Sequence, residues 1–71
     1  MQQGEPRTLL EAHEVVMKRR PPNTAKPSDW VAFRLGNARV YEAVADVDRG
    51  HHHEALYWAG YEKRRAEEGQ T

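Results

Sequence analysis

The sequence predicts an all-α protein of three helices, and three features of the chain support this. A capping box at Thr8–Glu11 opens a short amphipathic segment. Apolar residues then recur every three or four positions over 29–46 and again over 51–67, which is the spacing of a helix face. Proline-rich and glycine-containing segments separate these stretches. We therefore expect helices over about 9–19, 29–46 and 51–67.

The first helix is predicted from both of its ends. The Thr8 hydroxyl can accept a hydrogen bond from the Glu11 amide, while the Glu11 carboxylate reaches back to the Thr8 amide. Pro21-Pro22 ends the helix, because a residue that precedes proline is disfavoured in the α region. One helix face contains Leu9, Leu10, His13, Val16 and Met17. Residues 1–7 are polar and are expected to form a disordered tail.

The second and longest helix is predicted to follow an extended connector. Residues 20–27 contain three prolines and no large apolar side chain. Ser28 or Asp29 is the expected N-cap. One stripe of this helix contains Trp30, Phe33, Asn37, Val40, Tyr41, Val44 and Val47. Because Gly36 costs about 1 kcal/mol relative to alanine in a helix interior, its presence indicates that a neighbouring group approaches closely.

The third helix is predicted to fold back on the second after a short turn at 46–50. Gly50 suits a left-handed position after the second helix, and Asp48 suits either a turn or a helix cap. So short a turn makes the two helices an antiparallel hairpin. The first helix is expected to lie either across this hairpin or on another subunit. Residues 8–68 then form a single domain, and 69–71 a frayed end.

The third helix has two apolar sides, although a helix in a small domain usually buries only one. Ala55, Trp58, Ala59, Glu62 and Ala66 form one stripe, whereas Tyr57 and Tyr61 form a second stripe almost opposite to it. Trp30 and Trp58 are expected to fill the contact between the second and third helices. That assignment leaves Tyr57 and Tyr61 for a partner, and tyrosine is common at protein interfaces.

The 71 residues have room for one small domain with a marginal core, because so short a chain buries only about 60% of its surface. Such domains are commonly stabilised by disulfides, a metal or oligomerisation, and the absence of cysteine removes disulfides and thiolate ligands. Eleven basic and eleven acidic residues cancel, whereas domains that bind phosphate backbones are usually basic. The chain has no long apolar run and does not start like a signal peptide. We expect a cytoplasmic homo-oligomer that is not bound to a membrane.

Three consecutive histidines at the start of the third helix suggest a metal site. Helical metal ligands usually lie three or four positions apart, so His51 and Glu54 are the possible pair, completed by Asp48 or His13. The commoner alternative is that one imidazole caps the turn or bonds a carboxylate while the others face solvent. His13 lies on the apolar stripe of the first helix, and we interpret it as a core residue.

An enzymatic function is not expected. The candidate catalytic residues are His51, His52, His53, Glu54, Asp48 and Tyr57. The chain has no cysteine nucleophile, no glycine-rich phosphate loop and no GxSxG motif. A domain of this size also has little room for a substrate pocket of several hundred cubic ångströms. We therefore expect neither catalytic residues nor a cofactor.

Basic residues around the connector support an alternative function, nucleic-acid binding. These residues are Lys18, Arg19, Arg20, Lys26 and Arg34. Because the net charge is zero, the basic bias typical of a helix C-terminus is the simpler interpretation.

Two resemblances bear on the family of this chain. Trp30, Tyr41 and the segment Asp48-Arg49-Gly50-His51-His52-His53-Glu54-Ala55-Leu56-Tyr57-Trp58-Ala59 are similar to a group of short, uncharacterised actinobacterial proteins, over most of the chain after Thr8. That resemblance implies an intracellular bacterial helical protein and no particular activity. The hairpin also resembles one tetratricopeptide unit at Trp30, Leu35-Gly36 and Glu54-Ala55-Leu56, although the spacing differs and no repeat follows.

The leading hypothesis is a small non-enzymatic helical protein–protein interaction module that self-associates. Its expected interface contains Tyr57, Tyr61, Leu9, Leu10, Val16 and Met17. The alternatives are nucleic-acid association through the basic residues and divalent metal binding at the histidine cluster.

Overall fold

A computed structural model describes residues 5–69, and these residues form three α-helices, so the predicted all-α fold class is confirmed. The helices are α1 (Leu9–Lys18), α2 (Pro27–Val47) and α3 (His52–Gly69), and one 3₁₀ turn, Arg49–His51, joins α2 to α3. Residues 1–4 of the predicted tail, and 70–71 of the predicted frayed end, lie outside the described residues. Gly69, expected in the frayed end, is the last residue of α3.

One of the two hydrogen bonds predicted for the capping box is present at the start of α1. The Thr8 hydroxyl accepts a hydrogen bond from the Glu11 amide at 3.1 Å. The Glu11 carboxylate, however, accepts from the amide of Arg7 at 2.8 Å rather than from that of Thr8. The helix ends at Lys18, one residue before the predicted end. The bond to Thr8 satisfies one of the amides that the first turn of any helix leaves free, whereas the bond to Arg7 holds the residue before the cap.

The start of α2 lies two residues before the predicted one. Lys26 is the N-cap and Pro27 the first helical residue, where its fixed φ is favourable and its missing amide is not needed. The prediction that Ser28 or Asp29 caps this helix is therefore wrong. Asp29 instead accepts a hydrogen bond from the Lys26 amide at 3.2 Å from within the first turn.

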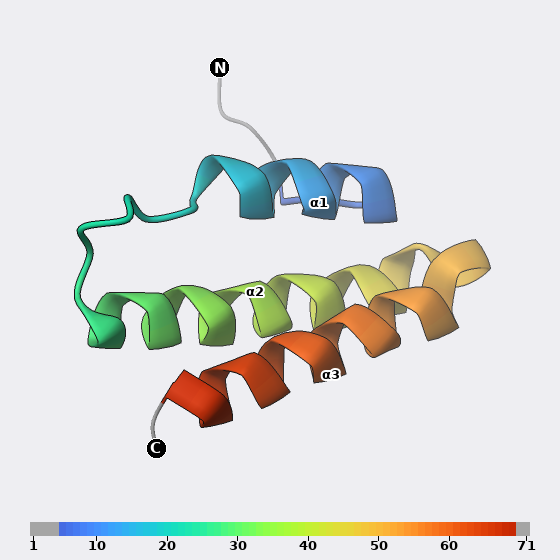
Figure 1. Cartoon of the computed structure of the whole chain (residues 1–71). Coiled ribbons are helices and arrows are strands. Elements are labelled where there is room, and N and C mark those ends of the chain that lie inside the picture. Colours follow the sequence, from blue (N-terminus) through green and yellow to red (C-terminus); the bar gives the residue numbers. More distant parts are fainter. Residues whose placement is uncertain (1–4, 70–71) are drawn as a thin grey trace.

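The three helices form a flattened layer with α2 in the middle (Figure 1). The chain measures 34 × 30 × 13 Å along its principal axes. α1 and α3 both run antiparallel to α2 and pack against it. The predicted antiparallel hairpin of α2 and α3 is thus present, and α1 packs on the hairpin of its own chain. This arrangement leaves a groove between α1 and α3.

The core of this layer consists mainly of small side chains. Among residues 5–69, eleven apolar residues are buried, and six of them are alanines. The buried residues of α3 are Ala55, Ala59, Glu62 and Ala66. The prediction that Trp30 and Trp58 fill the contact of α2 with α3 is wrong, because both indoles are only partly buried at the edge of the core. Small side chains allow the two helices to approach closely.

Asp48, in the corner between α2 and α3, attaches α1 to the hairpin. Its Oδ2 atom accepts a hydrogen bond from the Leu9 amide at 2.9 Å, across 39 positions of sequence. The same oxygen accepts from Nδ1 of His51 at 2.8 Å.

Gly50 does not adopt the predicted left-handed conformation, since no described residue has a positive φ. A 3₁₀ turn reverses the chain instead.

Gly36 is close to a neighbour, as predicted, and the neighbour is a flexible side chain. A Cβ atom at this position would lie 2.5 Å from Nη2 of Arg19, and the other near atoms also belong to that guanidinium. We expect Gly36→Ala to raise the free energy of unfolding by about 0.5–1 kcal/mol, because Arg19 can move while the helix gains propensity. Chemical denaturation measures this change.

Gly50→Ala is the control for this prediction. An added Cβ at Gly50 would have no neighbour within 4 Å, and the residue lies outside the α-helices, so the propensity gain does not apply. A loss of stability in Gly36→Ala would show that the Arg19 contact matters more than helix propensity.

Candidate functional site in the groove between α1 and α3

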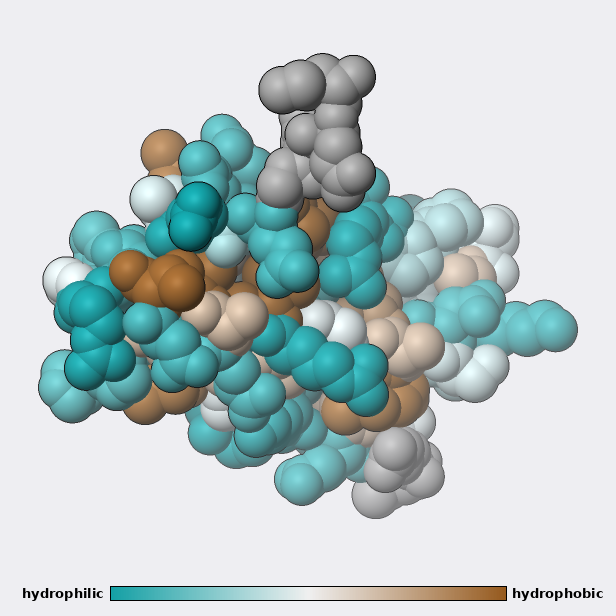
Figure 2. Space-filling view, turned by 180° about the vertical axis from the view of Figure 1, so that it is seen from behind, coloured by the Kyte–Doolittle hydropathy of each residue, from teal (hydrophilic) through white to brown (hydrophobic). Residues whose placement is uncertain are grey.

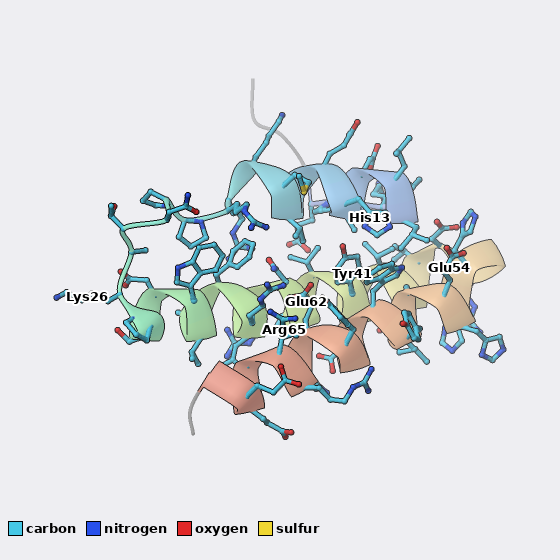
Figure 3. All side chains as sticks on the ribbon, in the orientation of Figure 1. His13, Lys26, Tyr41, Glu54, Glu62 and Arg65 are labelled. Carbon is cyan, nitrogen blue, oxygen red and sulfur yellow. The ribbon has the colours of Figure 1, made fainter. Side chains whose placement is uncertain are left out.

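The groove between α1 and α3 contains a cavity of about 230 Å³ at its centre. A second cavity, of about 320 Å³, lies between the start of α2 and the end of α3. The central cavity is lined by His13, Val16, Met17 and Arg20 on one side, by Trp58 and Glu62 on the other, and by Phe33, Arg34 and Tyr41. In Figure 3, His13 on α1 and Tyr41 on α2 point toward one another across it. All three helices therefore contribute to one concave surface.

Trp58 is the centre of an aromatic cluster on this surface. Its ring contacts the His13 ring edge-on at 5.4 Å and stacks near Tyr41 at 6.3 Å. Tyr57 and Tyr61 contact it edge-on at 5.4 and 5.5 Å. The two apolar stripes predicted for α3 are therefore not independent, because Trp58 connects the tyrosines to the groove. Such edge-on geometry is the favoured arrangement of aromatic pairs.

His13 and Tyr41 form a polar contact within this cluster. The Tyr41 hydroxyl lies 2.7 Å from Nδ1 of His13. Burial, together with the negative charge of Glu62, raises the pKa of Tyr41 from 10.0 to about 12. The phenol therefore stays protonated at physiological pH. His13 is partly buried and lines the cavity, so it lies at the edge of the core.

Glu62 is a buried carboxylate, only 4% exposed, at the base of the groove. Its Oε1 atom accepts a hydrogen bond from Nη1 of Arg34 and one from Nδ2 of Asn37, both at 3.2 Å. Asn37 is fully buried, and its Oδ1 atom has no partner among the described residues. The Glu62 carboxylate is thus paired with two donors across the contact of α2 with α3, whereas one polar atom of Asn37 is left unpaired there.

Sequence reasoning did not identify this polar network. Asn37 and Glu62 were placed on the apolar stripes of their helices without a role. That position was the available signal, because a polar residue at a core position of each of two adjacent helices indicates a pair. Arg34 was assigned to a different face and to nucleic acid. It instead neutralises Glu62 within the chain.

Two of the three consecutive histidines form hydrogen bonds in the corner between α2 and α3. Nδ1 of His51 donates to Asp48, and Nδ1 of His52 lies 2.7 Å from the Ala45 carbonyl, one of the last carbonyls of α2. His53 is exposed and its ring contacts that of His52. Within residues 5–69, no three His, Cys, Asp or Glu side chains are grouped to hold a metal ion. Metal binding at His51 and Glu54 stays a prediction.

The basic residues of the nucleic-acid alternative are partly used within the chain. The Arg34 guanidinium is paired with Glu62, that of Arg20 lies over the Trp30 ring at 5.3 Å, and that of Arg19 lies against Gly36. Lys18 and Lys26 are exposed near the two ends of the connector. Nucleic-acid binding remains a prediction.

The predicted interface residues divide into two groups. Leu9 and Val16 are buried against the other helices of the same chain, so the prediction that they contact a partner is wrong. Leu10, Met17 and Tyr57 are 69%, 67% and 59% exposed. Tyr61 is half-buried against Trp58. The exposed members border the groove, because Met17 lines it, Leu10 lies seven positions before Met17 on the same helix face, and Tyr57 contacts Trp58.

The chain matches no protein-family model, no curated protein and no solved structure. The resemblance to short actinobacterial proteins therefore stays a prediction. No described helix is both long enough and apolar enough to cross a membrane.

Proposed function

We propose that this chain is a small non-enzymatic helical interaction module that self-associates through the groove face. The groove face is defined by Leu10, Met17, Tyr57, Trp58 and Tyr61. The observation that supports it most directly is exposure. Leu10, Met17 and Tyr57 are the three most exposed large apolar side chains of the described residues. Met17 lines the groove, Leu10 lies on the same face of α1 as Met17, and Tyr57 contacts Trp58, which also lines the groove.

Figure 2 views the molecule from behind relative to Figure 1 and shows hydrophilic residues with several apolar patches among them. The other exposed large apolar side chains of the described residues, Leu35, Val47 and Leu56, are less exposed than these three and do not line the groove. A group of exposed apolar residues around one concave surface is typical of an interaction site. The tyrosines also have a hydroxyl for solvent or for a partner, which suits them to an interface.

Energetics favour an interaction on this face. The core is thin and built largely from alanine, so folding alone buries few large side chains. Covering one exposed Leu, Met or Tyr side chain contributes roughly 1.5–3 kcal/mol. Association would therefore add apolar burial that is significant for so small a domain.

Light scattering over a range of protein concentrations tests this proposal. We expect a mass above that of one chain at roughly tens of micromolar, and we expect Met17→Glu to weaken association at least about tenfold, because it places a charge in an apolar contact. Val47→Glu is the matched control, since Val47 is 54% exposed but does not line the groove. A wild-type chain that stays monomeric throughout would exclude the proposal.

A further inference from the structure

The exposed side of α1 has opposite charges at its two ends. Glu11 and Glu14 lie in its first half, whereas Lys18, Arg19 and Arg20 lie at and just after its end, and all five residues are exposed. Two such helices repel if they lie side by side in parallel, because like ends meet. They attract if they are antiparallel, because each acidic half then lies beside a basic half.

We infer that the occupant of the groove face is a second copy of this chain, related by a twofold axis that makes the two α1 helices antiparallel. This inference rests on the proposed function and specifies its geometry. Twofold dimers are the commonest symmetric assemblies, and in them the same patch is used on both subunits. The surface of α1 suits such a pairing, because the same helix carries both the acidic and the basic residues.

The positions of the apolar side chains set the register of this pairing. Leu10 and Met17 are seven residues apart, which is about 10.5 Å along a helix. An axis midway between them places Leu10 of each copy beside Met17 of the other. The same register brings Glu11 of one copy near Lys18 of the other, on both sides of the axis. Both α1 helices then lie over the groove of the opposite copy.

The size of the molecule allows such a dimer. The two long dimensions of the chain, 34 Å and 30 Å, give the broad side of the whole molecule, which includes the groove face, about 1,000 Å² in projection. A stable interface buries about 800 Å² on each partner. The groove between α1 and α3 is open at its centre, where the cavity is lined by Met17 and Trp58. A helix of the second copy can therefore reach the aromatic cluster.

Cysteine cross-linking tests the orientation directly, because the chain contains no cysteine of its own. The full chain is prepared as Leu10→Cys and as Met17→Cys, two exposed positions whose substitution leaves the core intact. A disulfide requires Cα atoms within about 7 Å. In the antiparallel pair, identical positions are about 10.5 Å apart along the axis, whereas position 10 of one copy lies beside position 17 of the other.

We expect neither variant alone to form the covalent dimer, and the equimolar mixture to form the mixed dimer under mild oxidation. Val47→Cys, on a surface outside the groove, is the control and is expected to stay uncross-linked. Cross-linking of each variant with itself would indicate parallel helices and overturn the inference. Wild-type self-association without any cross-link would also overturn it but leave the proposed function standing. A monomeric wild type would exclude both.

Discussion

Arg34→Ala is expected to lower the free energy of unfolding by about 3 kcal/mol. The substitution leaves the Glu62 carboxylate buried with only Asn37 as a donor, and breaking one side of a buried ion pair costs about 3–5 kcal/mol. The Arg34 side chain is 17% exposed, so the lower end of that range applies. A domain of 71 residues has roughly 4–10 kcal/mol in total. Urea denaturation therefore shows the change clearly.

Lys63→Ala is the matched control, because Lys63 and Glu42 also join α3 to α2 but lie at the surface. An exposed pair contributes about 0–1 kcal/mol, so this variant should be nearly as stable as the wild type. A second comparison uses Arg34→Met with Glu62→Leu. Replacing both charges by apolar groups leaves no uncompensated charge, but the buried Asn37 amide loses its acceptor, so about 1–3 kcal/mol is still lost. If Arg34→Ala costs less than about 1 kcal/mol, the ion pair is not important for stability.

The helices of this chain were predictable because the signals for them are local. The Thr8 cap, the prolines of the connector and the three-to-four spacing of α2 all act within a few residues of one another. The start of α2 was misplaced, since Pro27 was assigned to the connector although proline is equally suited to the first helical position. Gly50 was misread for a similar reason, because a glycine after a helix does not by itself require a left-handed conformation.

The candidate site was less predictable because it depends on contacts between distant residues. Sequence spacing identified Leu10, Met17 and Tyr57, which are exposed beside the groove. Spacing could not distinguish these exposed residues from the buried Leu9 and Val16, because the apolar pattern of α1 does not show which side chains pack against the other helices. The contacts of Glu62 with Arg34 and Asn37 link positions 28 and 25 residues apart. Only the packing of α3 on α2 brings them together.

Asp48, in the corner between α2 and α3, also bonds a residue that is distant in the sequence. Asp48 was predicted as a turn or cap residue; it lies in the turn after α2, and its carboxylate also accepts from the first amide of α1. The Leu9 amide, with a smaller contribution from the hydrogen bond and charge of His51, holds the pKa of Asp48 below its usual value, and partial desolvation opposes this. The carboxylate is therefore more acidic in the folded chain than in the unfolded chain.

Asp48→Asn is expected to flatten the loss of stability at acid pH. Because the folded pKa is lowered, the contribution of Asp48 is fully present above its unfolded pKa of about 3.9 and is lost as the pH falls through the folded pKa. The wild type should therefore lose stability more steeply than Asp48→Asn below about pH 4. Thermal melts between about pH 2.5 and 7 measure the two slopes. At pH 7 the variant should melt several degrees lower, since it lacks the charge that faces His51 and the Leu9 amide.

Two further variants separate the charge of Asp48 from its position. Asp46→Asn removes a nearby exposed carboxylate that makes none of the hydrogen bonds described for residues 5–69, so it should keep the wild-type slope below pH 4. Asp48→Ala removes the acceptor altogether and should speed hydrogen exchange at the Leu9 amide, because that amide loses its tertiary partner. If the wild type and Asp48→Asn lose stability equally steeply below about pH 4, the attachment of α1 by Asp48 does not make stability depend on pH. Unchanged exchange at Leu9 in Asp48→Ala would show that core packing alone holds α1 on the hairpin.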